Sequence, residues 1–496
     1  MLIQHVLFAQ DPSFLKGTEH MTTIDTVAQP VRAWLGIGYA TAVRFGQPTL
    51  LPFNPELSHD QTGPAPMQAG DTSWLESANG VSEDCLNLNV WAPRDVSEEG
   101  LPVIVYLFGG GFEVGANTQT TSNASGLAAT GRAVGVSLNY RLGPFGWLSL
   151  SQYGGAFANA TNLGLQDVIT ALKWVKENIA RFGGDPQNVT VAGHSAGAYS
   201  TIGLLAAPAA DGFYRRLAAF SGGASRIVPA WWAEELAFTF LSALGVADDP
   251  ERLLTLDAKL LAETLIKVSP RDIGDRHGID NTTIGLVNDF AQPGAVLSGT
   301  PLSVLASGHH RNIDILLSTT TNEADWWVIN AAEKFDPGSV ANLVNELVVK
   351  SRIPRSRARQ LVAAYDINGR TPLEVRGALF TDYFFMLPAA RAALAHAAAG
   401  GNVHMLTVGP AEGAPAVHGT EMYGIVGQKR PGQSDGQASR DAVVRDALLN
   451  FASGNSHLLW ERVTTEPTSH RVGDIPFNPS AHAAEVLRRF EGLERT

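Results

Sequence analysis

The pentapeptide Gly193-His194-Ser195-Ala196-Gly197 contains the serine of this chain that is best placed for nucleophilic chemistry. An apolar run, Val189–Ala192, precedes it, and a helical pattern, Ala198–Ala206, follows it. This order of strand, sharp turn and helix is typical of a nucleophile elbow, which exposes a serine hydroxyl above a sheet. The glycines on either side leave room for the tight turn. The pattern therefore predicts that Ser195 is a nucleophile.

A serine hydroxyl is a weak nucleophile unless a base takes its proton and an acid orients that base. Glu323 follows the apolar run Ile313–Leu317, and His418 follows the run Val403–Thr407. Because both residues come after the carboxyl ends of expected strands, we expect them at the sheet edge where Ser195 emerges. Taken singly, Glu323 also reads as a solvated turn carboxylate and His418 as an ordinary loop histidine. Their joint placement, in the chain order serine, acid, histidine, favours catalysis.

A site for the oxyanion of an acyl-transfer intermediate is predicted after the run Val103–Leu107. The next residues are Phe108-Gly109-Gly110-Gly111-Phe112, whose glycines let the backbone approach a substrate closely. Their N–H groups, together with that of Ala196 after the nucleophile, are the expected donors to the oxyanion. A tight turn and a phosphate cradle are alternatives, although no Gly-Lys-Ser/Thr follows to favour a nucleotide loop.

Short β-branched runs alternate with helical patterns, which predicts parallel βαβ units in one sheet. The expected strands are Val103–Leu107, Val134–Leu138, Val189–Ala192, Leu217–Phe220, Ile313–Leu317 and Val403–Thr407. Leu165–Arg181 is the clearest helix, because its apolar residues repeat at spacings of three and four. Residues 225–300 and 326–400 are mainly helical, as cap insertions would be, and residues 431–440 read as a mobile loop. We expect an α/β fold with a large, mostly parallel central sheet flanked by helices.

Composition narrows the class of protein. The chain has 496 residues, a net charge of −12 and no basic stripe, which disfavours nucleic-acid binding. Its single cysteine, Cys85, allows no intrachain disulfide and fits a reducing compartment. Residues 1–30 read as an N-terminal extension without a signal peptide, with translation starting at Met1 or Met21, and no stretch approaches the ~20 apolar residues of a membrane span. We therefore expect a cytoplasmic protein.

Longer motifs carry a resemblance to a known family. They are Ser82–Val90, Asn139–Gly146, Phe182–Pro186, Thr319–Ala324 and His418–Met422. With them the chain resembles the type-B carboxylesterase/lipase family of α/β-hydrolases from about Leu35 to about Trp460. The resemblance implies one α/β-hydrolase catalytic domain over residues 31–494, with caps near 225–300 and 326–400.

The resemblance also implies a role for each candidate residue. The roles are nucleophile for Ser195, general base for His418, orienting acid for Glu323, and oxyanion donors for Gly110, Gly111 and Ala196. Glu83 and Arg141 fall where the family places a structural ion pair, and Cys85 reads as a buried thiol. Asn322 replaces the Asp that is common before the acid, so nearby Asp325 is a rival to Glu323.

Aromatic side chains close to these motifs are candidates for an apolar acyl or aryl pocket. The candidate pocket residues are Phe112, His194, Trp231, Trp232 and Trp326, with Trp327 beside them. His194 stands where many members of the family have Glu or Gln, and it either tunes the local field or caps the elbow. Phe108 replaces the more usual His or Tyr and reshapes one pocket wall. Trp74 is a loose match to a gorge tryptophan.

The sequence thus predicts hydrolysis of a small carboxylic ester through an acyl-enzyme on Ser195, without metal or organic cofactor. The motif H-E-x-x-H is absent, and the pair His309-His310 reads as a solvated loop. The same triad would serve a carbamate or an activated amide. A non-catalytic, cholinesterase-like binding protein is a remote alternative, because such members typically lack a triad residue. Whether the chain is a monomer or a homo-oligomer stays open.

Overall fold

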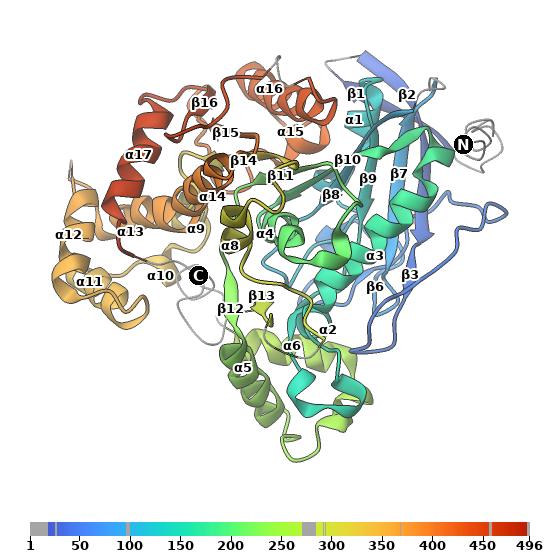
Figure 1. The fold of residues 1–496 in the computed structure, drawn as a ribbon, viewed down its shortest axis with the longest axis horizontal. Helices are drawn as coiled ribbons and strands as arrows, with labels where there is room; N and C mark the ends of the chain where they lie inside the picture. The colour runs from blue at the N-terminus through green and yellow to red at the C-terminus, as the bar shows by residue number, and fades with distance from the viewer. Residues whose placement is uncertain are drawn as a thin grey trace.

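The computed structural model describes the chain except for residues 1–17, 25–26, 96–99, 270–283, 291, 293, 368, 456–458 and 494–496. The described residues build one ten-stranded sheet that runs through the middle of the molecule (Figure 1). In spatial order its strands are β1 (Thr18–Ile24), β2 (Val27–Gly38), β7 (Asn87–Pro93), β9 (Val134–Leu138), β8 (Leu101–Leu107), β10 (Gly184–His194), β11 (Arg216–Phe220), β14 (Asp314–Thr320), β15 (Val403–Val408) and β16 (Ser469–Val472).

The six strands expected from the sequence are confirmed as β8, β9, β10, β11, β14 and β15. They pair in parallel, and β16 extends them at one edge. Strands β9 and β11 are buried along their whole length. Continuous apolar runs are what parallel strands covered on both faces require, and this is why these six were readable from the sequence.

At the other edge, β1, β2 and β7 pair antiparallel, and β7 joins the parallel strands through β9. The predicted extension over residues 1–30 is therefore too long. Thr18–Ile24 pairs with β2 in a regular register from Thr18 opposite Ala33 to Ile24 opposite Val27. Backbone groups that find ladder partners in this way belong to the sheet, while residues 1–17 lie outside the described residues.

Helices pack against the sheet and fix its strands. Helix α3 (Leu163–Asn178) and helix α4 (Ala196–Gly203) contact β10, and α14 (Leu387–Ala398) contacts β14 and β15. The expected helix 165–181 is confirmed as α3 followed by a short turn, Ile179–Phe182. The predicted loop over 431–440 is partly wrong. Helix α16 (Asp435–Ala452) begins inside it, because Ser434 and Gln437 form a capping box.

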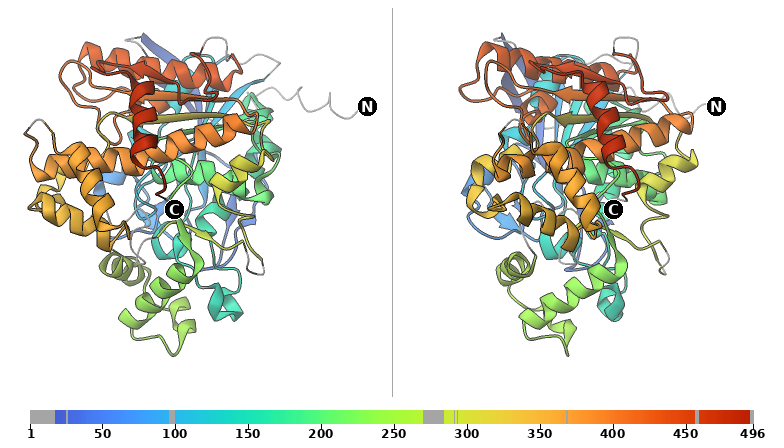
Figure 2. Two further views of the ribbon diagram at one scale, coloured as in Figure 1. Left: turned by 60° about the vertical axis from the view of Figure 1, so that its left-hand side comes forward. Right: turned by 90° about the vertical axis from the view of Figure 1, so that its left-hand side faces the viewer.

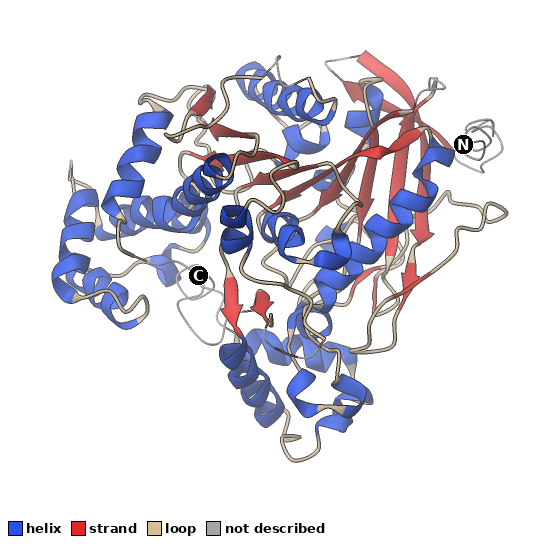
Figure 3. Cartoon of the chain, viewed as in Figure 1, coloured by secondary structure: helices blue, strands red, loops and turns tan. Residues whose placement is uncertain are grey.

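The two predicted cap segments are mainly helical, as Figure 3 shows. The first contains β12 (Ile227–Pro229), α5 (Ala230–Ala243), α6 (Ala258–Val268) and β13 (Leu286–Asn288). The second contains α9 (Asp325–Asn330), α10 (Ala332–Phe335), α11 (Val340–Val349), α12 (Arg355–Tyr365) and α13 (Pro372–Thr381), and ends in α14. Helices α5 and α6 project away from the sheet at the bottom of Figure 1 and of both views in Figure 2. No helix in the described part of the chain has the length and apolar character to cross a bilayer.

The predicted structural ion pair has different partners. Arg141 binds Asp167 at 2.7 Å in the interior, and Glu83 binds Arg44 instead. Both carboxylates lie close to their guanidinium groups only after folding, since α3 supplies Asp167 and an N-terminal loop supplies Arg44. The separation of these residues along the chain could not show which carboxylate each guanidinium group binds. Cys85 is a buried free thiol, as expected, and burial raises its pKa.

Candidate active site

Ser195 occupies the sharp turn between β10 and α4. Its backbone has φ 54° and ψ −118°, a left-handed conformation that is strained for a residue with a side chain. The turn leaves no space for side chains at its glycines. A Cβ on Gly193 would lie 2.3 Å from the carbonyl oxygen of Gly197, and a Cβ on Gly197 would lie 2.1 Å from that of Leu107. The two glycines of the pentapeptide are therefore a steric requirement of the elbow.

Three residues that are far apart in the sequence meet at this turn. The Nε2 atom of His418 lies 2.9 Å from Oγ of Ser195, and the Nδ1 atom of His418 lies 2.7 Å from Oε2 of Glu323. A carboxylate only accepts, so Nδ1–H donates to Glu323 and Nε2 is left to accept the serine proton. The structure thus brings together all three residues expected from the sequence. Asp325, the rival acid, accepts from the side chain of Asn322 at 2.9 Å instead.

Glu323 is fully buried, and its carboxylate is held by several donors. The backbone N–H of Thr320 donates to its Oε1 at 2.8 Å, and the hydroxyl of Ser221 lies 2.7 Å from the same oxygen. Burial raises the pKa of Glu323, and these hydrogen bonds oppose that rise. The backbone N–H of His418 also donates to the Glu323 carbonyl at 3.2 Å, so the acid and base loops are tied directly together.

A second buried carboxyl, Glu421, extends this network. The hydroxyl of Ser221 lies 2.7 Å from Glu323 and 2.6 Å from Glu421, yet it has one proton to donate. Burial and the neighbouring Glu323 charge raise the pKa of Glu421 to about 8. One of the two carboxyls must therefore carry a proton, and because Glu323 already accepts from Thr320 and His418, we assign it to Glu421, which donates to Ser221 while Ser221 donates to Glu323.

Ser221 and Glu421 were not among the residues predicted from the sequence. Ser221 directly follows β11, and its neighbour strand β14 leads to Glu323. Polar residues after the carboxyl ends of adjacent parallel strands share one edge, and that rule could have found it. Glu421 lies in a motif that was recognised only for its histidine.

Aromatic rings enclose the histidine of this site. The imidazole of His418 lies 5.3 Å from the Trp327 ring, 5.0 Å from Phe385 and 4.8 Å from His194, centroid to centroid. Phe385 belongs to a π-helical turn, Asp382–Met386, a distortion often found at functional sites. Burial lowers the pKa of His418, and the positive charge of Arg226 lowers it further, so the ring is neutral at rest.

Three backbone N–H groups close to Ser195 are left without an acceptor in the described part of the chain. Among the described residues, the N–H groups of Gly110, Gly111 and Ala196 donate to no protein acceptor. The carbonyl of Gly110 accepts from the N–H groups of Glu113 and Val114, both at 3.1 Å. Because a trans peptide directs its C=O and N–H to opposite sides, this turn points the Gly111 N–H away from itself. Ala196 lies at the N-terminus of α4, where the helix dipole favours negative charge.

A pocket of about 350 Å³ opens over these groups. Its described lining includes Ser195, His418, Gly110, Gly111, His194, Arg226, Phe108, Trp74, Trp326 and Trp327. The predicted pocket residues His194 and Trp326 thus lie in its wall, as do Phe108 and Trp74. The tryptophans and Phe108 give this wall an aromatic character.

Three predicted pocket residues are placed elsewhere. Phe112 is fully buried, with its ring 4.2 Å from that of Trp147. Trp231 is 58% exposed, and Trp232 packs on a separate small cluster that contains Val228. None of these three residues belongs to the described lining of the pocket over Ser195. Phe112 turns into the core at a positive φ of 68°, and both tryptophans belong to the first turn of α5, directly after β12.

His194 is nearly fully buried in the pocket wall, and neither ring nitrogen has a hydrogen-bond partner among the described residues. Burial and the nearby His418 ring lower its pKa well below the usual range. The side chain is therefore a neutral imidazole. Without a hydrogen bond to a described residue, the imidazole makes no contact that would cap the elbow.

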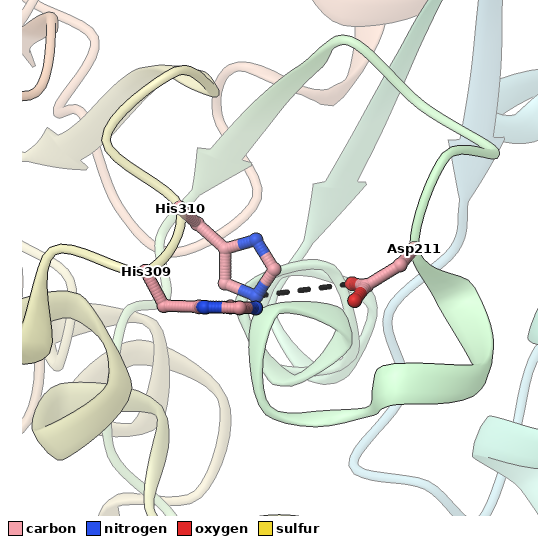
Figure 4. Close-up of side chains that lie close together, drawn as sticks. All are labelled: Asp211, His309 and His310. Atoms are coloured by element: carbon pink, nitrogen blue, oxygen red, sulfur yellow. Dashed lines mark ion pairs between the residues drawn. The ribbon is translucent and has the colours of Figure 1, made fainter.

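The exposed residues Asp211 and His309 lie beside the largely buried His310 (Figure 4), whose Nε2 is 3.8 Å from the Asp211 carboxylate. The possible metal-ligand atoms of these three residues lie within 4.8 Å of one another. All three come before the amino ends of β11 and β14, whereas Ser221 and Glu323 follow the carboxyl ends of these strands. An ion held here would lie at the amino ends of the parallel strands, whereas Ser195 lies at their carboxyl ends.

Comparisons with known proteins agree with this geometry. The family whose model matches residues 6–470 is described as the carboxylesterase family. The para-nitrobenzyl esterase of Bacillus subtilis is 37% identical over 62% of this chain and 62% of its own length. The cholinesterase 1 of Branchiostoma lanceolatum is 33% identical over 52% of this chain, and mouse neuroligin-2 is 30% identical over 94% of it. The matched part of the para-nitrobenzyl esterase is thus under two thirds of that protein.

Solved structures match over a greater length. A PNB esterase superposes with a TM-score of 0.79 and 29% identity, covering 95% of this chain and all of its own. A carboxylesterase from Geobacillus stearothermophilus gives a TM-score of 0.78 at 27% identity over 94% of this chain. This likeness, together with the mixed sheet and its flanking helices, confirms the expected α/β-hydrolase fold.

The protonated state of Glu421 predicts a pH-dependent stability. Its pKa is raised by folding from 4.5 to about 8, so its stabilising effect is full below about pH 4.5 and is lost as the pH rises through about 8. We expect Glu421→Gln, which keeps a neutral hydrogen-bonding side chain, to flatten the fall in unfolding midpoint between about pH 5 and pH 9. Thermal unfolding followed by circular dichroism measures this. An equally steep fall in the variant would contradict the assignment.

Proposed function

The chain belongs to the carboxylesterase family, and from that premise we propose that it is a serine esterase that hydrolyses carboxylic esters. The observation that carries the proposal is the unbroken line of hydrogen bonds from Ser195 through His418 to Glu323, with distances of 2.9 and 2.7 Å. We place the activity in one catalytic domain, residues 31–494, with the caps near 225–300 and 326–400. A cytoplasmic location stays a prediction, which cell fractionation tests.

The proposed reaction begins with attack of Ser195 Oγ on the ester carbonyl carbon. Nε2 of His418 takes the serine proton, and the carbonyl oxygen becomes an oxyanion bound by the N–H groups of Gly110, Gly111 and Ala196. The intermediate collapses when the bond to the alcohol oxygen breaks and His418 gives its proton to that oxygen. Water then attacks the acyl carbon while His418 takes one of its protons. The bond to Ser195 Oγ breaks, His418 gives that proton to Oγ, and the carboxylic acid leaves.

Glu323 has two functions in this mechanism. It holds the Nδ1–H tautomer of His418, and its charge stabilises the imidazolium that forms in each half-reaction. A proton on Glu421 leaves Glu323 as the single negative charge beside His418. The hydrogen bond from Ser221 then keeps the Glu323 carboxylate oriented without adding a second charge.

The pocket favours esters with an apolar or aromatic group. Trp74, Trp326, Trp327 and Phe108 line it, and such side chains bind flat, apolar surfaces. The name of the para-nitrobenzyl esterase indicates an aryl-bearing ester for that relative, and we propose the same class for this chain. A carbamate or activated amide would use the same residues, and substrate profiling separates these alternatives.

The test compares the wild type with Ser195→Ala on p-nitrophenyl acetate, butyrate and octanoate. We expect turnover by the wild type and a loss of about a thousandfold or more in the variant, because no other group replaces the nucleophile. Circular dichroism of both proteins controls for folding. Equal turnover by a folded Ser195→Ala protein would contradict the proposal, and the ratios among the three esters measure the length of the acyl site.

The choice of acid is tested by a matched pair of substitutions. Glu323→Gln removes the charge beside His418, whereas Asp325→Asn removes a charge whose partner is the Asn322 side chain. We expect kcat to fall on the order of a hundredfold or more for Glu323→Gln and to change little for Asp325→Asn. Steady-state kinetics on p-nitrophenyl butyrate measures both. The reverse order of effects would make Asp325 the acid.

A further inference from the structure

Arg226 is a buried cation in the wall of the catalytic pocket. It is 3% exposed, and it lines the pocket together with Ser195 and His418. Its Nη2 donates to the carbonyl oxygens of Gly111 and Ile284, both at 3.3 Å. One guanidinium thus connects the expected oxyanion loop, residues 108–112, with the segment that leads into β13.

The same guanidinium contacts the side chain at the end of that loop. Its central carbon lies 4.8 Å from the ring centre of Phe112 and 5.9 Å from that of Tyr199. The Phe112 carbonyl accepts from the N–H of Gly143 at 2.8 Å, and its ring packs on Trp147. Arg226 therefore covers one side of an aromatic ring that other contacts hold from the core.

The loop needs such restraints, because its backbone is unusual. Gly110, Gly111 and Phe112 have φ values of 119°, 68° and 68°, three positive values in succession. Glycine adopts them freely, but at Phe112 the conformation is strained and persists only where the surroundings impose it. The Gly110 carbonyl is fixed by the turn to Glu113 and Val114, and the Gly111 carbonyl is fixed by Arg226. The two peptide planes that flank the Cα of Gly111 are therefore anchored, and the first of them contains the Gly111 N–H.

We propose that Arg226 is a positioning residue for ester hydrolysis, which clamps the oxyanion loop through Gly111 and Phe112 and stabilises the oxyanion by its fixed positive charge. The inference rests on the proposed function, because it presupposes an oxyanion at Gly110 and Gly111. It assigns Arg226 no bond to the substrate and no proton transfer. A preorganised donor set in a site shielded from water is the arrangement in which such positioning has most effect on the rate.

The charge of Arg226 has a second consequence that can be measured. The titratable and charged groups that face His418 are Glu323, His194 and Arg226, with Glu421 behind Glu323. The Arg226 charge lowers the pKa of His418. Loss of the charge therefore raises that pKa, and the acid limb of the pH–rate profile moves to higher pH.

The experiment uses the full chain with Arg226→Met, which keeps the apolar stem, and Arg226→Lys, which keeps the charge. Arg215→Met is the matched control, since Arg215 is an exposed residue that donates to the Asn312 carbonyl away from the pocket. The readouts are kcat and KM on p-nitrophenyl butyrate, the pH profile of kcat/KM, and inhibition by an aryl trifluoromethyl ketone. Addition of Ser195 Oγ to that ketone turns its carbonyl oxygen into an oxyanion and sends the serine proton to His418.

We expect Arg226→Met to lower kcat by about tenfold to a hundredfold with KM nearly unchanged, and to weaken ketone inhibition by a similar factor. Its acid limb moves to higher pH. In Arg226→Lys the acid limb stays in place while kcat still falls, because an ammonium cannot hold both carbonyls and stack on a ring. Arg215→Met behaves as the wild type.

Two results would overturn the proposal. One is an Arg226→Met protein with wild-type kcat and ketone inhibition. The other is a fall in kcat with neither the ketone inhibition nor the acid limb changed, which would give Arg226 a structural role only. Thermal unfolding shows whether Arg226→Met is misfolded. If it is, Arg226→Lys tests the proposal instead, and wild-type kcat and ketone inhibition in that variant would overturn it. If the wild type itself fails to hydrolyse the esters, the proposed function fails instead, and the two failures are thereby distinguished.

Discussion

The active region depends on one buried carboxylate that must stay hydrogen-bonded in an apolar interior. Glu323 is fully buried, and a carboxylate in such a place is costly unless several donors satisfy it. Its donors are the N–H of Thr320, the hydroxyl of Ser221 and the Nδ1–H of His418. They come from β14, from the end of β11 and from the loop after β15, which are adjacent in the sheet. Satisfying this group therefore fixes the carboxyl ends of these strands and orients the imidazole toward Ser195.

Backbone strain is present where the reaction is proposed to occur. Ser195 and Phe112 both have positive φ; Ser195 directly follows β10, and Phe112 lies in the loop after the neighbouring parallel strand β8. Such conformations persist when their surroundings determine them. At Ser195 the surroundings are the backbone bond to Phe220 at 2.9 Å and two glycines without space for a side chain. At Phe112 they are Trp147 and Arg226. The Ser195 hydroxyl and the loop of residues 108–112 are thus held in place before a substrate binds.

The sequence predicted the strands and helices that are determined by the pattern of their own residues. Continuous apolar runs marked the central parallel strands, and the placement of polar residues after them predicted which side chains meet. Strand β7 was missed because Asn87 and Asn89 interrupt its apolar pattern, although both are buried, and the side chain of Asn89 accepts from the Gly36 N–H. The orientation of the Phe112 side chain toward the core could not be predicted either, since it depends on backbone angles and on packing against residues that are distant in the sequence. The protonated Glu421 was not predictable either, because its pKa depends on burial beside Glu323.

The proposed mechanism requires that an acyl group be bound covalently to Ser195. The most direct measurement mixes the wild type with p-nitrophenyl butyrate, quenches in acid within one turnover, and locates the added mass by peptide mass spectrometry. The account predicts a butyryl group on Ser195 whose yield follows the burst of p-nitrophenol. Release of p-nitrophenol without a covalent adduct, or an adduct on another residue, would contradict it.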